Sequence, residues 1–291
     1  MAQVVVGPTS HHYTSQRLRH SYVDWGNVDK PLLLLIHGGK DHARSWDWVA
    51  LALREHFHVV APDLRGHGDS AWSIGGTYAL IEFTLDIAQL LDSLDVFPIR
   101  IIGHSMGGSV ALQYTGIFPE RVTKVVAIEG LGPAPHLIRD RPAHERMQTW
   151  IAEMQRLARR HPRRYPGLEE AVHRMQEANP RLSPEQAWHL TLHGTYREED
   201  GTYRWKFDNY VRAVSPYLFN AADAYGLWER ITCPVLLFRG TESWASDPDK
   251  DGRAHHFRDW RLVNVPGAGH WVHHDQLDVF LRHTREFLEV P

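Results

Sequence analysis

Cysteine is almost absent from this sequence: Cys233 is the only one in 291 residues, so the chain cannot form an internal disulfide bond. A single cysteine is typical of proteins from a reducing compartment. Long hydrophobic runs are missing as well, because no stretch approaches the roughly 18 consecutive apolar residues of a membrane-spanning helix. The N-terminal segment lacks the basic and apolar regions of a signal peptide. We therefore expect a cytoplasmic protein that does not insert into a membrane.

An excess of one charge is also lacking. The 32 basic and 35 acidic residues leave a net charge of −3, which gives no reason to expect a nucleic acid or an anionic membrane as partner. Histidine is abundant, with 21 residues, yet the pairs His11–His12 and His255–His256 lack an H-E-x-x-H or comparable metal-binding arrangement. We expect no metal and no cofactor, and the sequence does not indicate an oligomeric state.

Short apolar runs alternate with helical patterns between residues 17 and 130. The runs predict strands at 17–26, 32–36, 58–63, 99–103 and 124–129, and the 3.6-residue periodicity predicts helices at 80–94 and 109–118. The alternation returns with strands at 234–240 and 261–267 and a closing helix at 275–288, with Asp275 as its expected N-cap. Strands that alternate with helices indicate an α/β fold with a mainly parallel sheet.

Residues 131–230 interrupt this alternation, because they contain proline-broken helical runs and no convincing strand. We predict an α/β core of residues 1–130 and 231–291, with a helical cap inserted at 131–230. Eight arginines against three acids lie between Arg139 and Arg164; this favours a solvated helix face, with a preference for anionic substrates as the alternative. The aromatic residues of the cap are candidates for packing it on the core or for lining an apolar pocket. They are Trp150, Trp188, Tyr196, Trp205, Phe207, Tyr210, Tyr217, Phe219 and Trp228.

The strongest local motif is the segment IIGHSMGG at 101–108. A predicted strand leads directly into G-x-S-x-G and then into a helix, which is the context of a nucleophile elbow. Gly103 and Gly107 are expected where the turn is too tight for a side chain. The hydroxyl of Ser105 would project above the sheet at a helix N-terminus, where backbone N–H groups favour a developing negative charge. Ser105 is therefore the predicted nucleophile.

A second motif follows the strand at 32–36, which ends in His-Gly-Gly. A backbone without side chains beside the nucleophile can direct an N–H toward an oxyanion. We predict Gly39 as one donor, with Gly38 as the alternative, and the N–H of Met106 as the other donor.

A third motif, VPGAGHWVHHDQ at 265–276, places His270 after a strand and a glycine loop. A serine hydroxyl needs an imidazole that takes its proton and a third group that orients the imidazole. His270 would lie at the same edge of the sheet as Ser105, so it is the predicted base. His273 and His274 lie at the start of the closing helix, and we expect them to be surface residues.

Polar residues crowd the glycine-rich loop DLRGHGDS at 63–70. Asp63, Arg65, His67 and Asp69 match no zinc or carboxylate–histidine spacing. Polar side chains in such loops usually brace the backbone. We therefore expect a structural role for this loop.

Together these segments resemble the α/β-hydrolase fold family. The resemblance spans about residues 17–288 and rests on HGG at 37–39, DLRGHGDS at 63–70, GHSMGG at 103–108 and GAGHW at 267–271, in the family's order. It implies an eight-stranded, mostly parallel sheet with helices on both faces, a Ser–acid–His triad and a helical cap inserted after the sixth strand. Serine at the elbow argues against the family's dehalogenases and epoxide hydrolases, which use aspartate there.

The acid of the triad has three candidates. In the family it commonly follows the seventh strand in a G-x-x-D arrangement, but here the corresponding position is Ser243. Some members place it after the sixth strand, where this sequence has Glu129, and a buried carboxylate there would need a partner such as His270. We predict Glu129 as the acid, although it could instead only tie down the cap. Asp247 and then Glu242 are the alternatives.

We predict from these features a serine hydrolase that cleaves a small to medium, apolar carboxylic ester through an acyl-enzyme. A carbon–carbon bond hydrolase, an acyltransferase and a perhydrolase share the same triad and remain alternatives. A ligand receptor with the hydrolase fold is a different class, which an intact triad disfavours.

Overall fold

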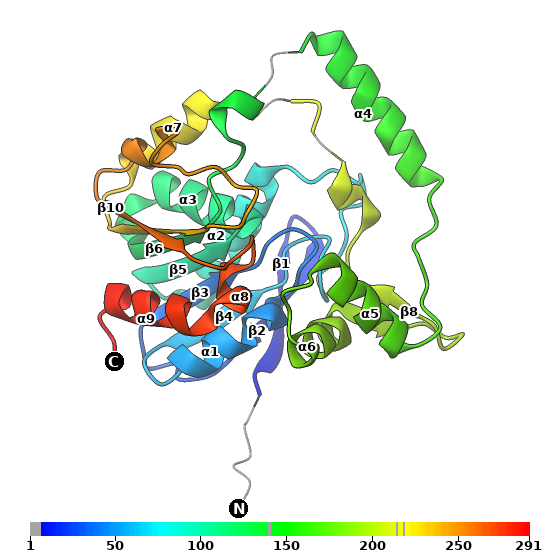
Figure 1. Cartoon of the computed structure of the whole chain (residues 1–291), viewed down its shortest axis with the longest axis horizontal. Helices are drawn as coiled ribbons and strands as arrows, with labels where there is room; N and C mark the ends of the chain where they lie inside the picture. The colour runs from blue at the N-terminus through cyan, green and yellow to red at the C-terminus, as the bar shows by residue number, and fades with distance from the viewer. Residues whose placement is uncertain (1–6, 139–140, 214, 218) are drawn as a thin grey trace, which may run out of the picture.

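The computed structural model describes residues 7–138, 141–213, 215–217 and 219–291. Eight strands form its main sheet in the order β1-β2-β4-β3-β5-β6-β9-β10 (Figure 1). Strand β2 is antiparallel to β1 and β4, and all other neighbours are parallel. The strands are β1 (Thr9–Ser15), β2 (Leu18–Asp24), β3 (Leu32–Ile36), β4 (His58–Pro62), β5 (Ile99–His104), β6 (Val122–Ile128), β9 (Val235–Gly240) and β10 (Trp260–Val265). This sheet confirms the predicted α/β architecture.

Helices cover both faces of the sheet, which explains why its central strands are continuous apolar runs. One face carries α2 (Leu80–Leu94), α3 (Met106–Ile117) and α7 (Ala221–Arg230) over a buried cluster that includes Trp228. The other carries α1 (Asp47–Leu53), α8 (Val272–Asp275) and α9 (Leu277–Leu288) over a second cluster that includes Trp46 and Phe280. Cys233 is a free, buried member of the first cluster, and burial raises the pKa of its thiol to about 11.

Within its described residues, the inserted region between β6 and α7 contains three α-helices and a hairpin; it corresponds to the predicted cap, and we use that name for it. They are α4 (Ala143–Ala158), α5 (Leu168–Ala178), α6 (Pro184–Gly194), β7 (Thr195–Arg197) and β8 (Tyr203–Trp205). Helices α5 and α6 pack together beside the sheet, whereas α4 stands apart and buries only Leu157 (Figure 1). The hairpin corrects the expectation of a segment without strands: its strands have three residues each, too few for a visible periodicity.

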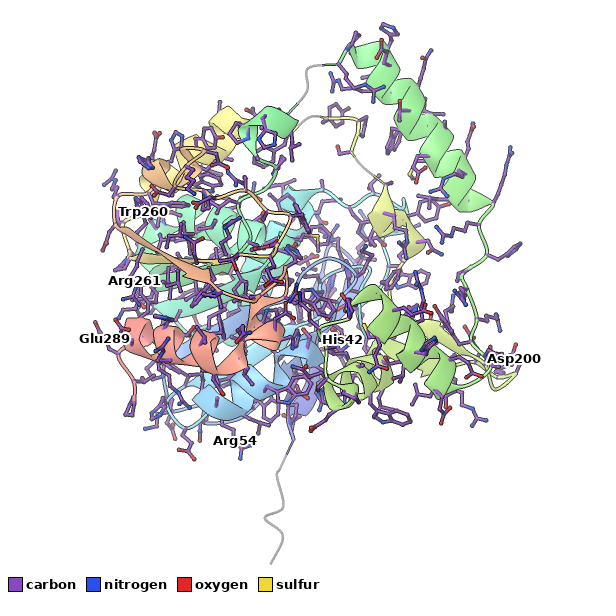
Figure 2. All side chains as sticks on the ribbon, in the orientation of Figure 1. His42, Arg54, Asp200, Trp260, Arg261 and Glu289 are labelled. Atoms are coloured by element: carbon purple, nitrogen blue, oxygen red, sulfur yellow. The ribbon has the colours of Figure 1, made fainter. Side chains whose placement is uncertain are left out.

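The cap and the core meet along α6. His42 of the core lies at this junction (Figure 2), and its Nε2 is 2.9 Å from the carbonyl oxygen of Leu190. Trp48 and Trp271 of the core pack against a small apolar cluster around Leu182 and Leu190. Helix α7, although it falls within the predicted cap range, packs on α3 of the core.

Short 3-10 helices complete the chain: η1 (Ala43–Trp46), η2 (Pro119–Arg121), η3 (Pro135–Leu137), η4 (Asn209–Arg212) and η5 (Arg253–His256). The closing helix begins later than expected, at Leu277 with Gln276 as its N-cap, because the preceding residues form the separate helix α8. In the described part of the chain, every helix is too short or too polar to cross a membrane.

Candidate active site

Ser105 occupies the sharp turn between β5 and α3. Its backbone has φ 51° and ψ −118°, a left-handed conformation that a non-glycine residue rarely adopts. Its N–H donates to the carbonyl of Ile128 (2.8 Å) in the neighbouring strand. A Cβ on Gly103 would lie 2.3 Å from the carbonyl oxygen of Gly107, and a Cβ on Gly107 would lie 2.3 Å from that of Ile36. The turn therefore needs both glycines, and it holds the serine at the N-terminus of α3.

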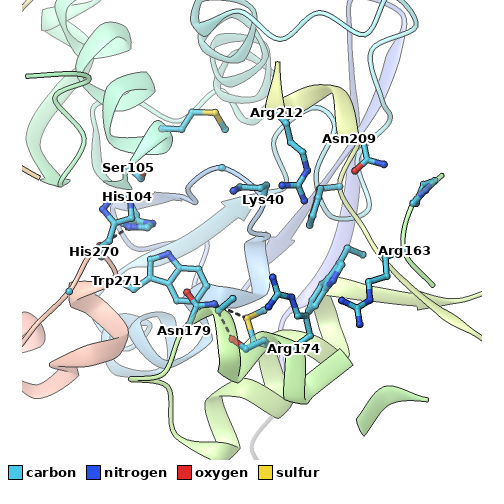
Figure 3. A pocket seen from close by; sticks show the side chains of 18 of the residues that line it. Lys40, His104, Ser105, Arg163, Arg174, Asn179, Asn209, Arg212, His270 and Trp271 are labelled. Atoms are coloured by element: carbon cyan, nitrogen blue, oxygen red, sulfur yellow. Dashed lines mark hydrogen bonds between the residues drawn. The ribbon is translucent and has the colours of Figure 1, made fainter. Parts of the chain in front are cut away.

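His270 lies in the loop after β10 and lines the same cavity as Ser105 (Figure 3). Its Nδ1 is 2.6 Å from Oε2 of Glu129. A neutral imidazole that donates from Nδ1 leaves a lone pair on Nε2, which is the atom that can accept a proton. Asp275 steadies the loop, because its carboxylate accepts the N–H of Gly269 (2.7 Å).

Glu129 follows β6, and its side chain is completely buried. Its Oε1 accepts the N–H of Gly240 (2.9 Å), and its Oε2 accepts the hydroxyl of Ser243 (2.6 Å) in addition to facing His270. A buried carboxylate is costly unless hydrogen bonds and a cation compensate it. Two neutral donors and one imidazole meet that need here and fix the orientation of the ring.

The other two candidate acids are engaged elsewhere. Glu242 pairs with Arg181 of the cap, and Asp247 accepts the N–H of Asp249 (3.1 Å) and lies 3.9 Å from Lys250. Within the described residues, neither of these two carboxylates forms a hydrogen bond with His270. The structure thus brings Glu129 to His270, and not Asp247 or Glu242.

The predicted oxyanion donors Gly39 and Met106 line the cavity beside Ser105. His37 anchors the glycine turn: its Nε2 accepts the N–H of Leu64 (3.0 Å) and its Nδ1 donates to the carbonyl of Gly38 (2.7 Å). A Cβ on Gly38 would lie 3.2 Å from the Cβ of Ser105, whereas a Cβ on Gly39 would meet nothing within 4 Å. The turn therefore passes against the serine and opens into the cavity at Gly39.

The loop 63–70 is braced from inside, as the sequence suggests. The Asp63 carboxylate accepts the N–H groups of Ala43 (2.7 Å) and Asp69 (2.9 Å), and burial raises its pKa to about 6. Arg65 makes a bidentate pair with buried Asp86, with N···O distances of 2.6 and 2.7 Å. These side chains stabilise the loop and are not part of the cavity wall.

His273 and His274 correct an expectation, because both are buried and not on the surface. They belong to the short helix α8, which packs into the core. The ring of His273 stacks on Trp46, with centroids 4.5 Å apart, and lies 4.8 Å from the ring of His104. Burial, followed by the neighbouring imidazoles, holds the pKa of His273 well below its ordinary value. A contiguous group of neutral histidines thus packs behind the loop that carries His270.

One set of side chains in the described residues has the composition of a metal site: the ligand atoms of Asp47, His189 and His193 lie within 4.8 Å of one another. The sequence signal for it is the i, i+4 pair of histidines on α6, which was not among the predicted site residues. Arg44 already pairs with the Asp47 carboxylate at 2.6 Å, so a cation would have to displace a guanidinium. The set lies at the junction of cap and core and is not part of the wall around Ser105.

The cavity has a volume of about 910 Å³ and is lined by residues of the inserted region, from Arg160 to Arg212, together with residues of the core. Of the cap aromatics named above, Trp205 and Phe207 line it, whereas Trp228 belongs to the core and Tyr217 is exposed. The core adds three tryptophans, which are Trp72, Trp244 and Trp271. Sequence reasoning missed these three as lining residues, although Trp271 directly follows the predicted base His270 and Trp244 directly follows Ser243, at the position where the family commonly has its acid.

Comparisons with known proteins agree with this picture. Residues 33–283 match the profile of a family described as the alpha/beta hydrolase family. Esterase Rv0045c of Mycobacterium tuberculosis is 26% identical over 276 residues, which cover 92% of this chain and 86% of that protein. The sn-1-specific diacylglycerol lipase ABHD11 of Xenopus laevis is 28% identical over 275 residues, which cover 91% and 81%. The solved thioesterase domain from the curacin biosynthetic pathway has the same fold, with a TM-score of 0.82 at 24% identity over 96% of this chain and 99% of that one.

Proposed function

The chain belongs to the alpha/beta hydrolase family and is a hydrolase of this fold, and we propose that it cleaves a carboxylic ester with Ser105 as nucleophile. The observation that carries this proposal is the pairing of a strained serine elbow with an imidazole held by a buried carboxylate. The names of the two relatives, an esterase and a lipase, support an ester as the substrate.

In the proposed reaction, Ser105 attacks the ester carbonyl while Nε2 of His270 takes the hydroxyl proton. Glu129 keeps the imidazole in the tautomer that donates from Nδ1 and stabilises the imidazolium that forms. The imidazolium then protonates the leaving alkoxide, and the acyl group remains on the serine. A water molecule, activated by the same imidazole, releases the acid and restores the enzyme.

The N–H groups of Met106 and Gly39 would hold the oxyanion of both tetrahedral intermediates. Met106 is the first residue of α3, so its N–H has no partner within the helix and adds to the positive end of the helix dipole. Losing one such donor typically lowers turnover by about 10²–10³-fold.

Pre-steady-state kinetics with p-nitrophenyl esters of increasing chain length would test this function. We expect a burst of p-nitrophenol close to one equivalent per active site, followed by slower steady turnover, because an acyl-enzyme accumulates when deacylation is slower. The Ser105→Ala variant is the matched control, since the elbow accepts the smaller side chain. Turnover by that variant at the parental rate would refute the serine mechanism.

A further inference from the structure

The wall of the cavity beside Ser105 carries a large excess of positive charge. Six arginines and one lysine line it, and Asp275 is the single carboxylate among the described lining residues. Asp275 is moreover engaged with the N–H of Gly269. This charge excess is local, because the whole chain has a net charge of −3.

Three of the six arginines have acidic partners outside the cavity. Their partners are Glu177 for Arg174, Glu242 for Arg181 and Glu198 for Arg204. The pairs of Arg174 and Arg181 are exposed and that of Arg204 is partly buried, and none of the three needs a ligand.

Four cations remain, and within the described part of the chain they form no ion pair with a carboxylate, although the charge of Arg160 acts on Glu153 of the same region. They are Lys40, Arg160, Arg163 and Arg212. Arg163 lies over the ring of Tyr165 and Arg212 over that of Phe207, which are contacts with neutral groups. Partial burial and then the charge of Arg212 lower the pKa of Lys40, and partial burial and then the charge of Arg160 lower that of Arg212. The cations therefore repel one another, and an anion placed between them would relieve that repulsion.

Their positions relative to the reacting groups are informative. Ser105 and His270 lie at one end of the cavity, Arg163 lies at the other, and Lys40 and Arg212 point into the space between (Figure 3). Lys40 directly follows Gly39, the predicted oxyanion donor. A substrate whose ester carbonyl is at Ser105 would thus extend past Lys40 and Arg212.

We propose that the substrate is an anionic ester, whose carboxylate or phosphate group binds between Lys40 and Arg212, with Arg160 and Arg163 adding to the field. This inference rests on the proposed esterase function and names its substrate class. A preference for anionic substrates was the alternative interpretation of the arginine-rich segment 139–164. The proposal adopts that interpretation in place of the expected apolar substrate. The tryptophans of the wall would contact the aliphatic part of such a molecule.

Matched ester substrates test the proposal through kcat/KM. Ethyl hexanoate is neutral, and ethyl hydrogen adipate carries a terminal carboxylate at the same chain length. The ethyl ester of 6-(phosphonooxy)hexanoic acid carries a terminal phosphate. We expect the anionic esters to be preferred by about 10–100-fold, since a charge-assisted hydrogen bond is typically worth that much. Whichever anionic ester is preferred identifies the group that the site accepts. Equal kcat/KM for all three would overturn the proposal.

Substitutions of the cavity cations then test which of them cause the preference for anionic esters. Arg212→Gln and Lys40→Gln should each reduce the ratio of anionic to neutral kcat/KM by about 10-fold or more, and Arg212→Lys should retain part of it. Arg261→Gln is the matched control, because Arg261 is a surface arginine on β10 paired with Glu286, away from the cavity (Figure 2). A preference that persists in both cavity variants would refute the assignment.

Binding measurements separate this proposal from the esterase function itself. Isothermal titration of the protein with adipate, with neutral adipamide and with inorganic phosphate requires no turnover. We expect adipate or phosphate to bind, adipamide not to bind, and Arg212→Gln to weaken anion binding at least 10-fold. If anions bind in this way but no ester is hydrolysed, the esterase proposal fails and the anion site stands. If esters are hydrolysed but neither anion binds, the anion site fails.

Discussion

The hydroxyl of Ser243 donates a 2.6 Å hydrogen bond to the same Glu129 oxygen that lies 2.6 Å from Nδ1 of His270. Ser243 follows β9 and occupies the position at which family members commonly have the acid. Glu129 follows β6, which is the neighbouring strand in the sheet. The serine hydroxyl thus orients a carboxylate that reaches the histidine from β6 instead of β9. A glutamate is one methylene longer than an aspartate, which suits this approach.

Replacing Glu129 with glutamine should reduce kcat by about 10³–10⁴-fold while the protein remains folded. An amide at this position can still accept the N–H of Gly240, but it cannot stabilise an imidazolium and can fix the wrong tautomer. Steady-state kinetics and a thermal melt would measure both effects. Glu242→Gln and Asp247→Asn are the matched controls and should stay within a few-fold of the parent. A mild effect of Glu129→Gln together with a severe effect of Asp247→Asn would assign the acid to the loop after β9.

The acid that faces His270 should also function from position 243. In the double variant Glu129→Gln, Ser243→Asp, we expect at least 10-fold more activity than in Glu129→Gln alone, because position 243 already contacts the carboxylate that faces His270. Ser243→Asp alone should be impaired, since two carboxylates would then compete for one imidazole. Comparison of kcat among the four proteins forms a double-mutant cycle. If the losses of kcat in the two single variants simply add in the double variant, a carboxylate at position 243 does not replace the one at position 129.

The protein should lose stability as the pH falls from about 6.5 toward 4. Burial lowers the pKa of His42 and His274 to about 3 and of His67 to about 4, so these side chains stay neutral in the folded protein and bind protons only after unfolding. Each such histidine removes at most about 1.4 kcal/mol per pH unit below its unfolded pKa. The carboxyls of Asp41 and Asp63, whose pKa values burial raises to about 7 and about 6, oppose this trend but are fewer.

Urea unfolding at pH 7.5 and at pH 5.0 measures this dependence. His273→Phe is the sharper test, because the ring nitrogens of His273 have no hydrogen-bond partner among the described residues and its ring stacks on Trp46, a contact that phenylalanine can keep. That variant should lose less unfolding free energy between the two pH values than the parent does. An identical loss in both proteins would mean that His273 titrates normally in the folded state.

Removal of metal ions should leave the esterase rate unchanged. Proton transfer and oxyanion binding are assigned to side chains and amides, so a cation has no step to perform. The rate before and after dialysis against EDTA measures this directly. A loss of rate that zinc or manganese restores would contradict the metal-free mechanism and would direct attention to Asp47, His189 and His193.

Much of the sheet was predictable because its central strands are unbroken apolar runs, and helix α2 was predicted at its observed bounds of Leu80–Leu94. Strand β1 was not, because only Tyr13 and Ser15 of its seven residues are buried, so this edge strand shows no hydrophobic pattern. Helix α3 begins earlier than predicted, at Met106, because the elbow itself forms its first turn.

The sequence indicates some residues of the candidate site and not others, and the reasons are physical in both cases. Ser105, His270 and the two glycine turns follow directly from strand ends, and the carboxyl edge of a parallel sheet brings strand ends together. Lys40 and Arg212 were missed as a pair because they come from segments far apart in sequence that meet only across the cavity. The burial of His273 depends on Trp46 in a distant segment, which no local pattern reveals.

Covalent labelling tests the central claim most directly. The intact protein would be treated with a fluorophosphonate, digested, and analysed by peptide mass spectrometry. We expect one phosphonyl group per chain, on the peptide that contains Ser105, with no labelling in Ser105→Ala and slow labelling in His270→Gln. Modification of Ser109 or Ser243 instead, or undiminished labelling of the alanine variant, would contradict Ser105 as the nucleophile.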